Sequence, residues 1–399
     1  MNRAAETHVG PLARRLRPQR GMTLVELMVA LLLGLVTTYF IAQVFAVAEG
    51  QKRTATFGSD AQVNGAVALH TLKRHLQNSG YGLTSAVETL GCEIKGEYGP
   101  AGSTTPVPPM KLSPLLIVPS AVASAPSDNI GVLASTKTEF AVPNRVAVIS
   151  QPASGQNYIR VDQSVGTKMG DVMMTVPHDW EAANLPCTLF TVAGDNSTPE
   201  ATLSSRYIPL QSSGSASSFN NASPSVWAAP GVRPDDWVVN FGSIRWMVFG
   251  VSADNFQVVT WTPEGIGNAE QLQSGIVLLK ALYGRDTDND KTVDTYNTTV
   301  PANSAEWRQV LTVRLVVVAR SGQREKEIVT AAEPSWNVGS NVNVSYVGVP
   351  GTAATVCAAG AANCTVTLPL AHVSDWQYYR YKVFDTVVPL RNMLWNLGV

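Results

Sequence analysis

Charged side chains are scarce in this chain of 399 residues: Lys, Arg, Asp and Glu together make up 15% of it, and the formal net charge is −1. Proteins whose main partner is nucleic acid carry an extended basic face, so this balance argues against that class. Histidine occurs only five times, and the catalytic motifs GxSxG, HExxH and the P-loop are absent. The sequence therefore gives no positive case for an enzyme.

Cysteine is also rare, with four residues and no CxxC pair, which argues against a zinc site. An even number of cysteines, together with short apolar runs separated by Ser, Thr, Asn, Gly and Pro, is typical of an exported β-rich protein. Two disulfides are expected: Cys357–Cys364, which closes a short loop, and Cys92–Cys187. Free buried thiols are the alternative.

Proline is missing between Pro18 and Pro100, so nothing obligatory interrupts a helix from Met22 to about Asn78. The motif NSGYG (78–82) then predicts its end, with glycine as the C-cap. Glycines within the run weaken the middle of this helix. They are Gly50, Gly58 and Gly65.

Residues 22–48 carry one charge, Glu26, and as a helix they would extend roughly 40 Å, enough to cross the hydrocarbon layer of a membrane. In residues 49–79, apolar side chains recur every three or four positions, which predicts an amphipathic segment packed on a globular domain. The arginines Arg3, Arg14, Arg15, Arg17 and Arg20 precede the apolar run. This basic leader predicts a cytoplasmic N-terminus and a periplasmic domain.

Residues 80–399 alternate short apolar runs with turn residues, which predicts a β-rich domain. The longest predicted strands include 237–251, 310–320 and 376–390. Two segments rich in small or polar residues, about 199–232 and 333–375, are expected to be insertions. The expected fold class is α+β: a long N-terminal helix, membrane-spanning in its first half, packed on antiparallel sheet.

The stretch RGMTLVELMVALLLGLV (20–36) resembles the class III signal of type IV pilins and type II secretion pseudopilins. The resemblance implies that prepilin peptidase cuts after Gly21 and removes the leader, residues 1–21. Met22 would then be the first mature residue and receive an N-methyl group, and Glu26 would be the fifth residue.

Glu26 is costly where it stands, because a charge at the centre of a membrane-spanning helix costs about 2.5–3.5 kcal/mol on insertion scales. In a filament, the cationic N-terminus of a neighbouring subunit would restore a charge pair in low dielectric. Glu26 would then set the register of assembly. The alternative is a carboxylate that reaches the membrane edge from four residues inside the span.

Three further blocks resemble minor pilins of the PilW type: NSGYG (78–82), VRLVVVARSG (313–322) and YYRYKVFDTVVPLRNMLW (378–395). The resemblance implies a pilin-like fold and a protein that helps initiate pilus assembly and enters the pilus near its tip. The implied partners are the inner membrane, prepilin peptidase, the major pilin, other minor pilins and a tip adhesin. Two alternatives remain: a J-type minor pseudopilin of type II secretion, and a membrane-anchored periplasmic binding protein.

The segment DTDNDKTVDTYN (286–297) places four carboxylates at positions 1, 3, 5 and 9 of a calcium-type loop. They are Asp286, Asp288, Asp290 and Asp294. Lys291 and Asn297 replace the sixth-position glycine and twelfth-position glutamate of an EF-hand, and the flanking segment reads as strand. The sequence therefore predicts either a calcium site in a β-turn or a solvated acidic turn.

Overall fold

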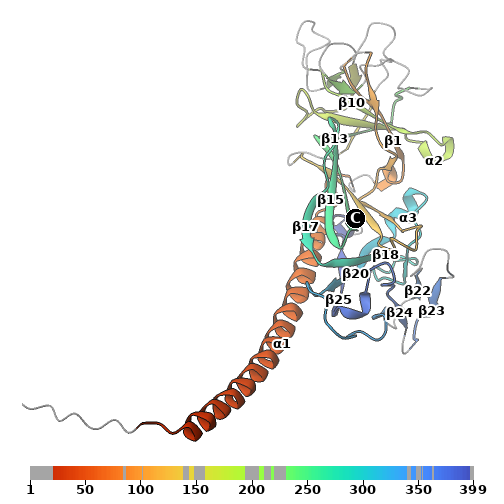
Figure 1. The fold of residues 1–399 in the computed structure, drawn as a ribbon. Coiled ribbons are helices and arrows are strands. Elements are labelled where there is room, and N and C mark those ends of the chain that lie inside the picture. Colours follow the sequence, from red (N-terminus) through yellow and green to blue (C-terminus); the bar gives the residue numbers. More distant parts are fainter. Residues whose placement is uncertain are drawn as a thin grey trace, which may run out of the picture. The chain divides into compact units, whose positions relative to one another are not determined.

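The computed structural model describes residues 21–83, 87–100, 102–137, 143–147, 158–193, 206–210, 217–219, 231–338, 343–346, 352, 354–361 and 364–395. The chain divides into two units, Met1–Thr56 and Phe57–Val399. Helix α1 (Leu24–Gln77) begins in the first unit and ends in the second (Figure 1). These bounds lie within two residues of the predicted ones.

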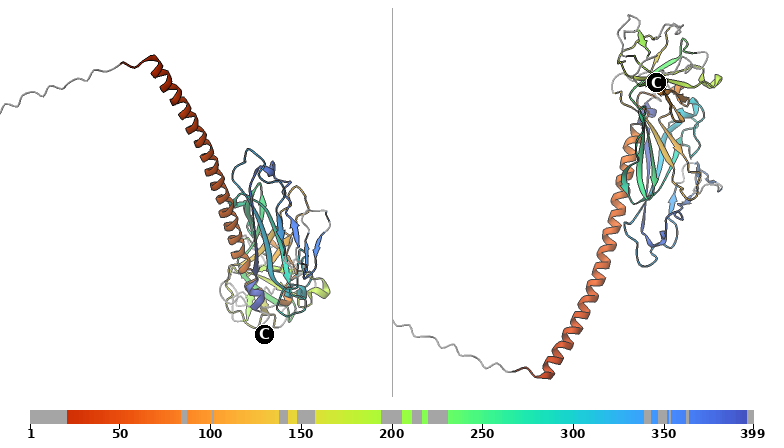
Figure 2. Two further views of the ribbon diagram at one scale, coloured as in Figure 1. Left: turned by 90° about the horizontal axis from the view of Figure 1, so that it is seen from below. Right: turned by 45° about the horizontal axis from the view of Figure 1, so that its top comes forward.

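In the second unit, the buried side of α1 follows the predicted spacing: Ala61, Ala68, Leu72 and Leu76 are each at most 1% exposed. They belong to one apolar cluster that includes residues from strands of all three large sheets. Figure 2 shows this part of α1 lying beside strands of the domain. Gly65 has a packing role, because a Cβ there would overlap the ring of Phe384. The close approach of helix and strand therefore requires glycine at this position.

The helix ends as the NSGYG motif predicts. Gly80 has φ 75°, a left-handed conformation that favours glycine. The Asn392 side-chain amide donates to the carbonyls of Asn78 (3.4 Å) and Ser79 (2.8 Å), which binds this turn to the C-terminal helix α4 (Arg391–Trp395).

The three large sheets all contribute side chains to the main apolar cluster. The first has the strand order β16-β15-β14-β6-β5, with β17 also paired to β15. Its strands are β5 (Leu115–Val118), β6 (Asn129–Ser135), β14 (Ile244–Ser252), β15 (Asn255–Thr262), β16 (Gly265–Ile266) and β17 (Glu270–Ser274).

The second sheet has the order β23-β22-β19-β18-β20-β25 and is antiparallel except for the β19–β22 pair. Its long strands are β18 (Ile276–Arg285), β20 (Val310–Arg320) and β25 (Tyr381–Pro389), and its short ones are β19 (Thr295–Asn297), β22 (Asn343–Tyr346) and β23 (Thr355–Cys357). Strands β18 and β20 are buried along most of their length.

A third sheet has the order β4-β1-β10-β9-β13-β7. It consists of β1 (Glu93–Lys95), β4 (Met110–Lys111), β7 (Asn144–Arg145), β9 (Val172–Val176), β10 (Cys187–Thr191) and β13 (Trp237–Gly242). Strands β1 and β10 are parallel.

Smaller elements complete the described part. The short sheets pair β8 (Tyr158–Arg160) with β11 (Tyr207–Pro209), β2 (Glu97–Gly99) with β3 (Thr105–Pro106) and β12 (Ser218–Phe219), and β21 (Ser335–Asn337) with β24 (Thr365–Thr367). The short helices are η1 (Val87–Thr89), α2 (Trp180–Ala183), α3 (Ser304–Arg308) and η4 (Trp376–Tyr378).

The fold class is confirmed: a long N-terminal helix and a β-rich domain of mainly antiparallel sheet. Two predicted strands were wrong in their bounds. Residues 237–251 form two strands in different sheets, because Gly242 takes φ 64° and the pairing register shifts there. Residues 376–390 begin as the turn η4, so the strand starts only at Tyr381.

The two expected insertions carry more structure than their composition indicated. Within 333–375, β22 extends the sheet of β18, and buried side chains such as Trp336 and Tyr346 form a second apolar cluster with that sheet. Within 199–232, the described residues include β11 and β12, each paired to an earlier strand. Residues 199–205, 211–216 and 220–230 lie outside the described residues.

Candidate processing and assembly site

The predicted processing site lies at the start of α1. Gly21, Met22 and Thr23 are in extended or irregular backbone, and the helix begins at Leu24. The rest of the predicted leader, residues 1–20, lies outside the described residues. The predicted cut after Gly21 therefore falls at non-helical backbone three residues before the helix.

Thr23 caps this helix. Its Oγ1 accepts a hydrogen bond from the Glu26 backbone N–H at 3.2 Å, and its carbonyl accepts from Leu27 N at 3.1 Å. Thr23 at the N-cap and Glu26 three residues later match the S/T-x-x-E/Q capping box. A carboxylate in the first turn is also stabilised by the positive end of the helix dipole. This local role of Glu26 was not predicted from the sequence.

The apolar part of the helix meets the requirements of a membrane span by length and composition. The candidate span is Leu24–Gly50, which has 27 residues and lies close to the predicted 22–48. The most apolar part of this span has no buried residues. Its large side chains are exposed, for example Leu24 at 76% and Leu35 at 72%. Such a surface is stable only where lipid or other apolar helices cover it.

The Glu26 side chain is exposed, and its carboxylate has no hydrogen-bond or ion-pair partner in the described part of the chain. The capping interaction uses its backbone N–H only. The side chain is thus available to a group outside this chain, as the resemblance to pilins implies.

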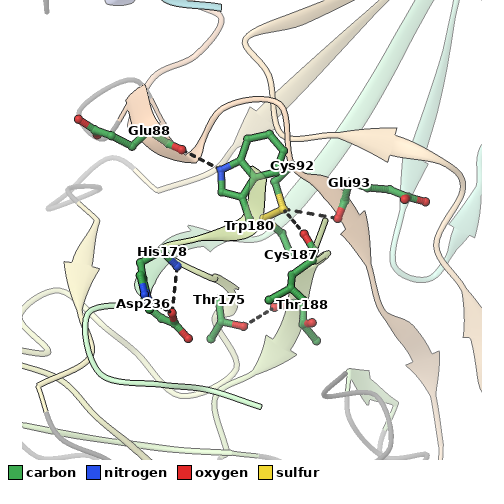
Figure 3. The surroundings of a disulfide bond; sticks show 10 residues. Glu88, Cys92, Glu93, Thr175, His178, Trp180, Cys187, Thr188 and Asp236 are labelled. Atoms are coloured by element: carbon green, nitrogen blue, oxygen red, sulfur yellow. Dashed lines mark hydrogen bonds and ion pairs between the residues drawn. A yellow bond between two sulfur atoms is a disulfide. The ribbon is translucent and has the colours of Figure 1, made fainter. Parts of the chain in front are cut away.

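The structure joins Cys92 to Cys187 and Cys357 to Cys364, the two pairs that the sequence favoured. Cys92 precedes β1 and Cys187 begins β10, so the first bond ties the parallel strands together and is fully buried. Near it, Trp180 Nε1 donates to the Glu88 carbonyl at 2.9 Å (Figure 3).

The second bond joins the end of β23 to the residue before β24. Both of its cysteines belong to the apolar cluster beneath that sheet. Each disulfide therefore joins segments that carry core residues.

The acidic loop gathers three of its four predicted ligands. Carboxylate oxygens of Asp286, Asp288 and Asp294 all lie within 4.8 Å of one another, so these residues can hold a cation. Asp290 stands outside the group, and its Oδ1 accepts from Thr292 N at 2.7 Å. Asn289 (φ 65°) takes the left-handed conformation that turns the loop.

In this loop, hydrogen bonds lower the pKa of the carboxyl groups, and repulsion between like charges raises it. The Thr287 backbone and hydroxyl donate to Asp294 Oδ2 and lower the pKa of Asp294. The Asp290 N–H lowers the pKa of Asp288, but burial and the neighbouring carboxylates outweigh it, so the net direction is upward. A bound cation would relieve this repulsion.

The described histidines are far from forming a shared site. His70 is exposed, and the ring of His75 lies 4.9 Å from that of Phe249. His178 Nδ1 lies 3.0 Å from Asp236 Oδ1 (Figure 3), and His372 Nε2 lies 2.9 Å from the Val277 carbonyl. These contacts hold loops and strands in place.

One buried polar feature was not predicted. Lys280 Nζ on β18 lies 2.8 Å from Asp128 Oδ1, and the side chains are 2% and 1% exposed. Asp128 Oδ2 also accepts from Ala281 N at 3.1 Å. The two partners are 152 positions apart in the sequence, so no local sequence pattern predicts this pair.

Comparison with known proteins adds two family matches. The model of the prokaryotic N-terminal methylation motif matches residues 16–38, and that of type IV pilus-assembly protein W (PilW) matches residues 251–392. The second match covers the structure from the last residues of β14 to the start of α4. Both describe structural pilin components.

Among solved structures, the type IV-like pilin TTHA1219 from Thermus thermophilus is similar, with 11% sequence identity, coverage of 81% of this chain and 96% of that chain, and a TM-score of 0.24. No curated protein gives a significant match. The two family matches lie where the resemblance was stated: the chain carries a prokaryotic N-terminal methylation motif over residues 16–38 and a region similar to type IV pilus-assembly protein W over residues 251–392.

Proposed function

We propose that the chain is a minor pilin that helps initiate type IV pilus assembly and is incorporated near the pilus tip with other minor pilins. The observation that carries this proposal is the presence in one chain of a methylation signal around Gly21 and a PilW region over 251–392. A J-type pseudopilin would share the signal, but the PilW match favours the pilus.

Assembly in this proposal rests on the first helix. Prepilin peptidase removes the leader, the methylated Met22 becomes the N-terminus, and the exposed apolar side chains of Leu24–Gly50 pack against helices of other subunits. The Glu26 carboxylate pairs with the N-terminal amine of a neighbour, which fixes axial register. The β-rich domain supplies the specific lateral contacts.

Glu26→Gln tests the register role. Gln also suits the third position of a capping box, so this variant keeps the helix start and removes only the charge. We expect normal membrane insertion but fewer pili on the cell and weaker co-purification with other pilins. The measurements are electron microscopy of cells and quantitative pull-down from detergent extracts.

Glu49→Gln is the matched control, because it removes a carboxylate from the other end of the same apolar segment. It is expected to leave both readouts unchanged. Unchanged piliation and co-purification in Glu26→Gln would refute the register role.

A further inference from the structure

A cavity of about 520 Å³ lies in the second unit between the C-terminal end of α1, β6 and β14. It is lined by Arg74, His75, Asn78, Ser79, Tyr81, Val132, Leu133, Ala134, Ser135, Lys137 and Met247. Its volume is within the range of sites that bind small molecules. Neither the methylation signal nor the predicted calcium loop contributes to it.

One wall is cationic. Arg74 and His75 come from the last turn of α1, and Lys137 follows β6. Lys137 is 7% exposed and its Nζ lies 2.6 Å from Asp171 Oδ2, which leaves further donors on the ammonium group. The lining itself contains no Asp or Glu among the described residues.

Two of these groups have unused polar atoms. Neither the Arg74 guanidinium nor the ring nitrogens of His75 have a hydrogen-bond partner within the described part of the chain. His75 is half-buried, held against Phe249 by ring contact. Arg74 is exposed, so its guanidinium and the half-buried His75 ring are donors that an incoming anion could accept from.

The facing wall is apolar. Val132 and Leu133 on β6 are each 2% exposed, and Ala134 and Met247 extend this surface. A ligand that satisfies both walls has a negatively charged head and an apolar body. Carboxylates meet this condition because arginine binds them with planar, paired hydrogen bonds.

We propose that this cavity binds an amphipathic carboxylate, with its head at Arg74, His75 and Lys137 and its apolar body against β6. The same chemistry is offered by a small free carboxylic acid and by an acidic side chain of another subunit that lies beside an apolar one. Contact with a second subunit here would link ligand recognition to the proposed pilus assembly.

The affinity of the cavity for a carboxylate is expected to depend on pH. Burial and the adjacent Arg74 charge lower the pKa of His75, so its imidazole is neutral near pH 7 in the free protein. A bound carboxylate favours the protonated imidazole, so affinity rises as the pH falls through the pKa of the complex. The other charged groups at the cavity are Arg74 and the Lys137–Asp171 pair.

The test uses the full chain in detergent, titrated with phenylacetate and, separately, inorganic phosphate by calorimetry. Phenylacetate is expected to bind at millimolar or lower concentration, more tightly at pH 5.5 than at pH 7.5, and Arg74→Ala is expected to weaken it about tenfold or more. Lys326→Ala, which removes an exposed cation away from the cavity, is the control and should bind as the wild type does.

Absence of phenylacetate binding, equal binding by Arg74→Ala, or phosphate binding as tight as phenylacetate would each overturn the proposal. A photoreactive residue at position 81 in intact cells distinguishes the two sources. A cross-link to another pilus subunit that disappears in Arg74→Ala identifies a protein carboxylate. Phenylacetate binding without such a cross-link identifies a small free acid.

Discussion

Glu26 has two separable roles at the start of α1. Its backbone N–H bonds to Thr23 Oγ1, which stabilises the helix start within a single chain. Its carboxylate has no partner in the described residues, and in the proposed assembly another subunit would recover its cost in lipid. The charge of Glu26 is therefore unfavourable in a single membrane-spanning helix and would be paired in the proposed assembly.

The acidic loop is predicted to bind calcium through three residues. Asp288→Asn and Asp294→Asn are expected to abolish the binding heat measured by calorimetry, since each removes a charge from the group. Asp290→Asn is the matched control and should retain binding, because Asp290 lies outside the group. No binding at millimolar calcium, or no effect of a chelator on thermal melting, would leave the loop as a solvated turn.

The buried Lys280–Asp128 pair is predicted to matter for stability mainly when it is broken. Asp128→Asn leaves the Lys280 ammonium buried without a counter-charge, and we expect a loss of about 3–5 kcal/mol in the free energy of unfolding. Asp375→Asn breaks the exposed pair with Arg324 and should cost at most about 1 kcal/mol.

Urea unfolding of both variants measures the difference. Asparagine also tolerates the left-handed backbone of Asp375 (φ 53°), so this control adds no backbone strain. Equal stability of the two variants would contradict this prediction, because it would mean that another group compensates the buried Lys280 charge.

Among the secondary-structure elements, the first helix was the most predictable from sequence. Its spacing, the missing proline and NSGYG are all local signals, and its bounds fell within two residues. Residues 237–251 show the limit: an apolar run does not reveal that Gly242 turns the chain from one sheet into another.

The two disulfides are predicted to differ in their effect on stability. A disulfide stabilises a protein by reducing the entropy of the unfolded chain. Its contribution to the free energy of unfolding is about 4–5 kcal/mol for a closed loop of about 100 residues and about 2–3 kcal/mol for a loop of about eight. Cys92 and Cys187 are 95 residues apart, and Cys357 and Cys364 are seven apart.

Replacing both cysteines of one bond by serine tests this difference. The Cys92/Cys187 double variant should unfold at a lower urea concentration than the Cys357/Cys364 double variant. The reverse order would mean that packing in the C-terminal cluster, and not loop length, dominates the contribution of these bonds.

For the whole molecule, some site residues lie close together in the sequence, and others come together only in the folded domain. Gly21, Met22 and Glu26 lie within one short motif, so the sequence could identify them together, and the family match covers the same stretch. The cationic cavity could not be predicted, because it brings Arg74 on α1 together with Lys137 after β6 and Met247 on β14. Only the folded domain places these three side chains around one space.

The proposed function depends on two events: processing of this chain as a prepilin and its entry into the pilus. Gly21→Ala is expected to block cleavage, since the peptidase signal requires that glycine, and Gly34→Ala, a glycine within the helix, should leave cleavage unchanged. Both variants can be followed by the size of the protein in membrane fractions.

The most direct measurement is mass spectrometry of the N-terminus of this protein in pili sheared from wild-type cells. If the chain is processed and assembled as proposed, the protein is present in that fraction and begins with N-methylated Met22. A protein that is confined to the membrane fraction and still begins at Met1 would contradict it.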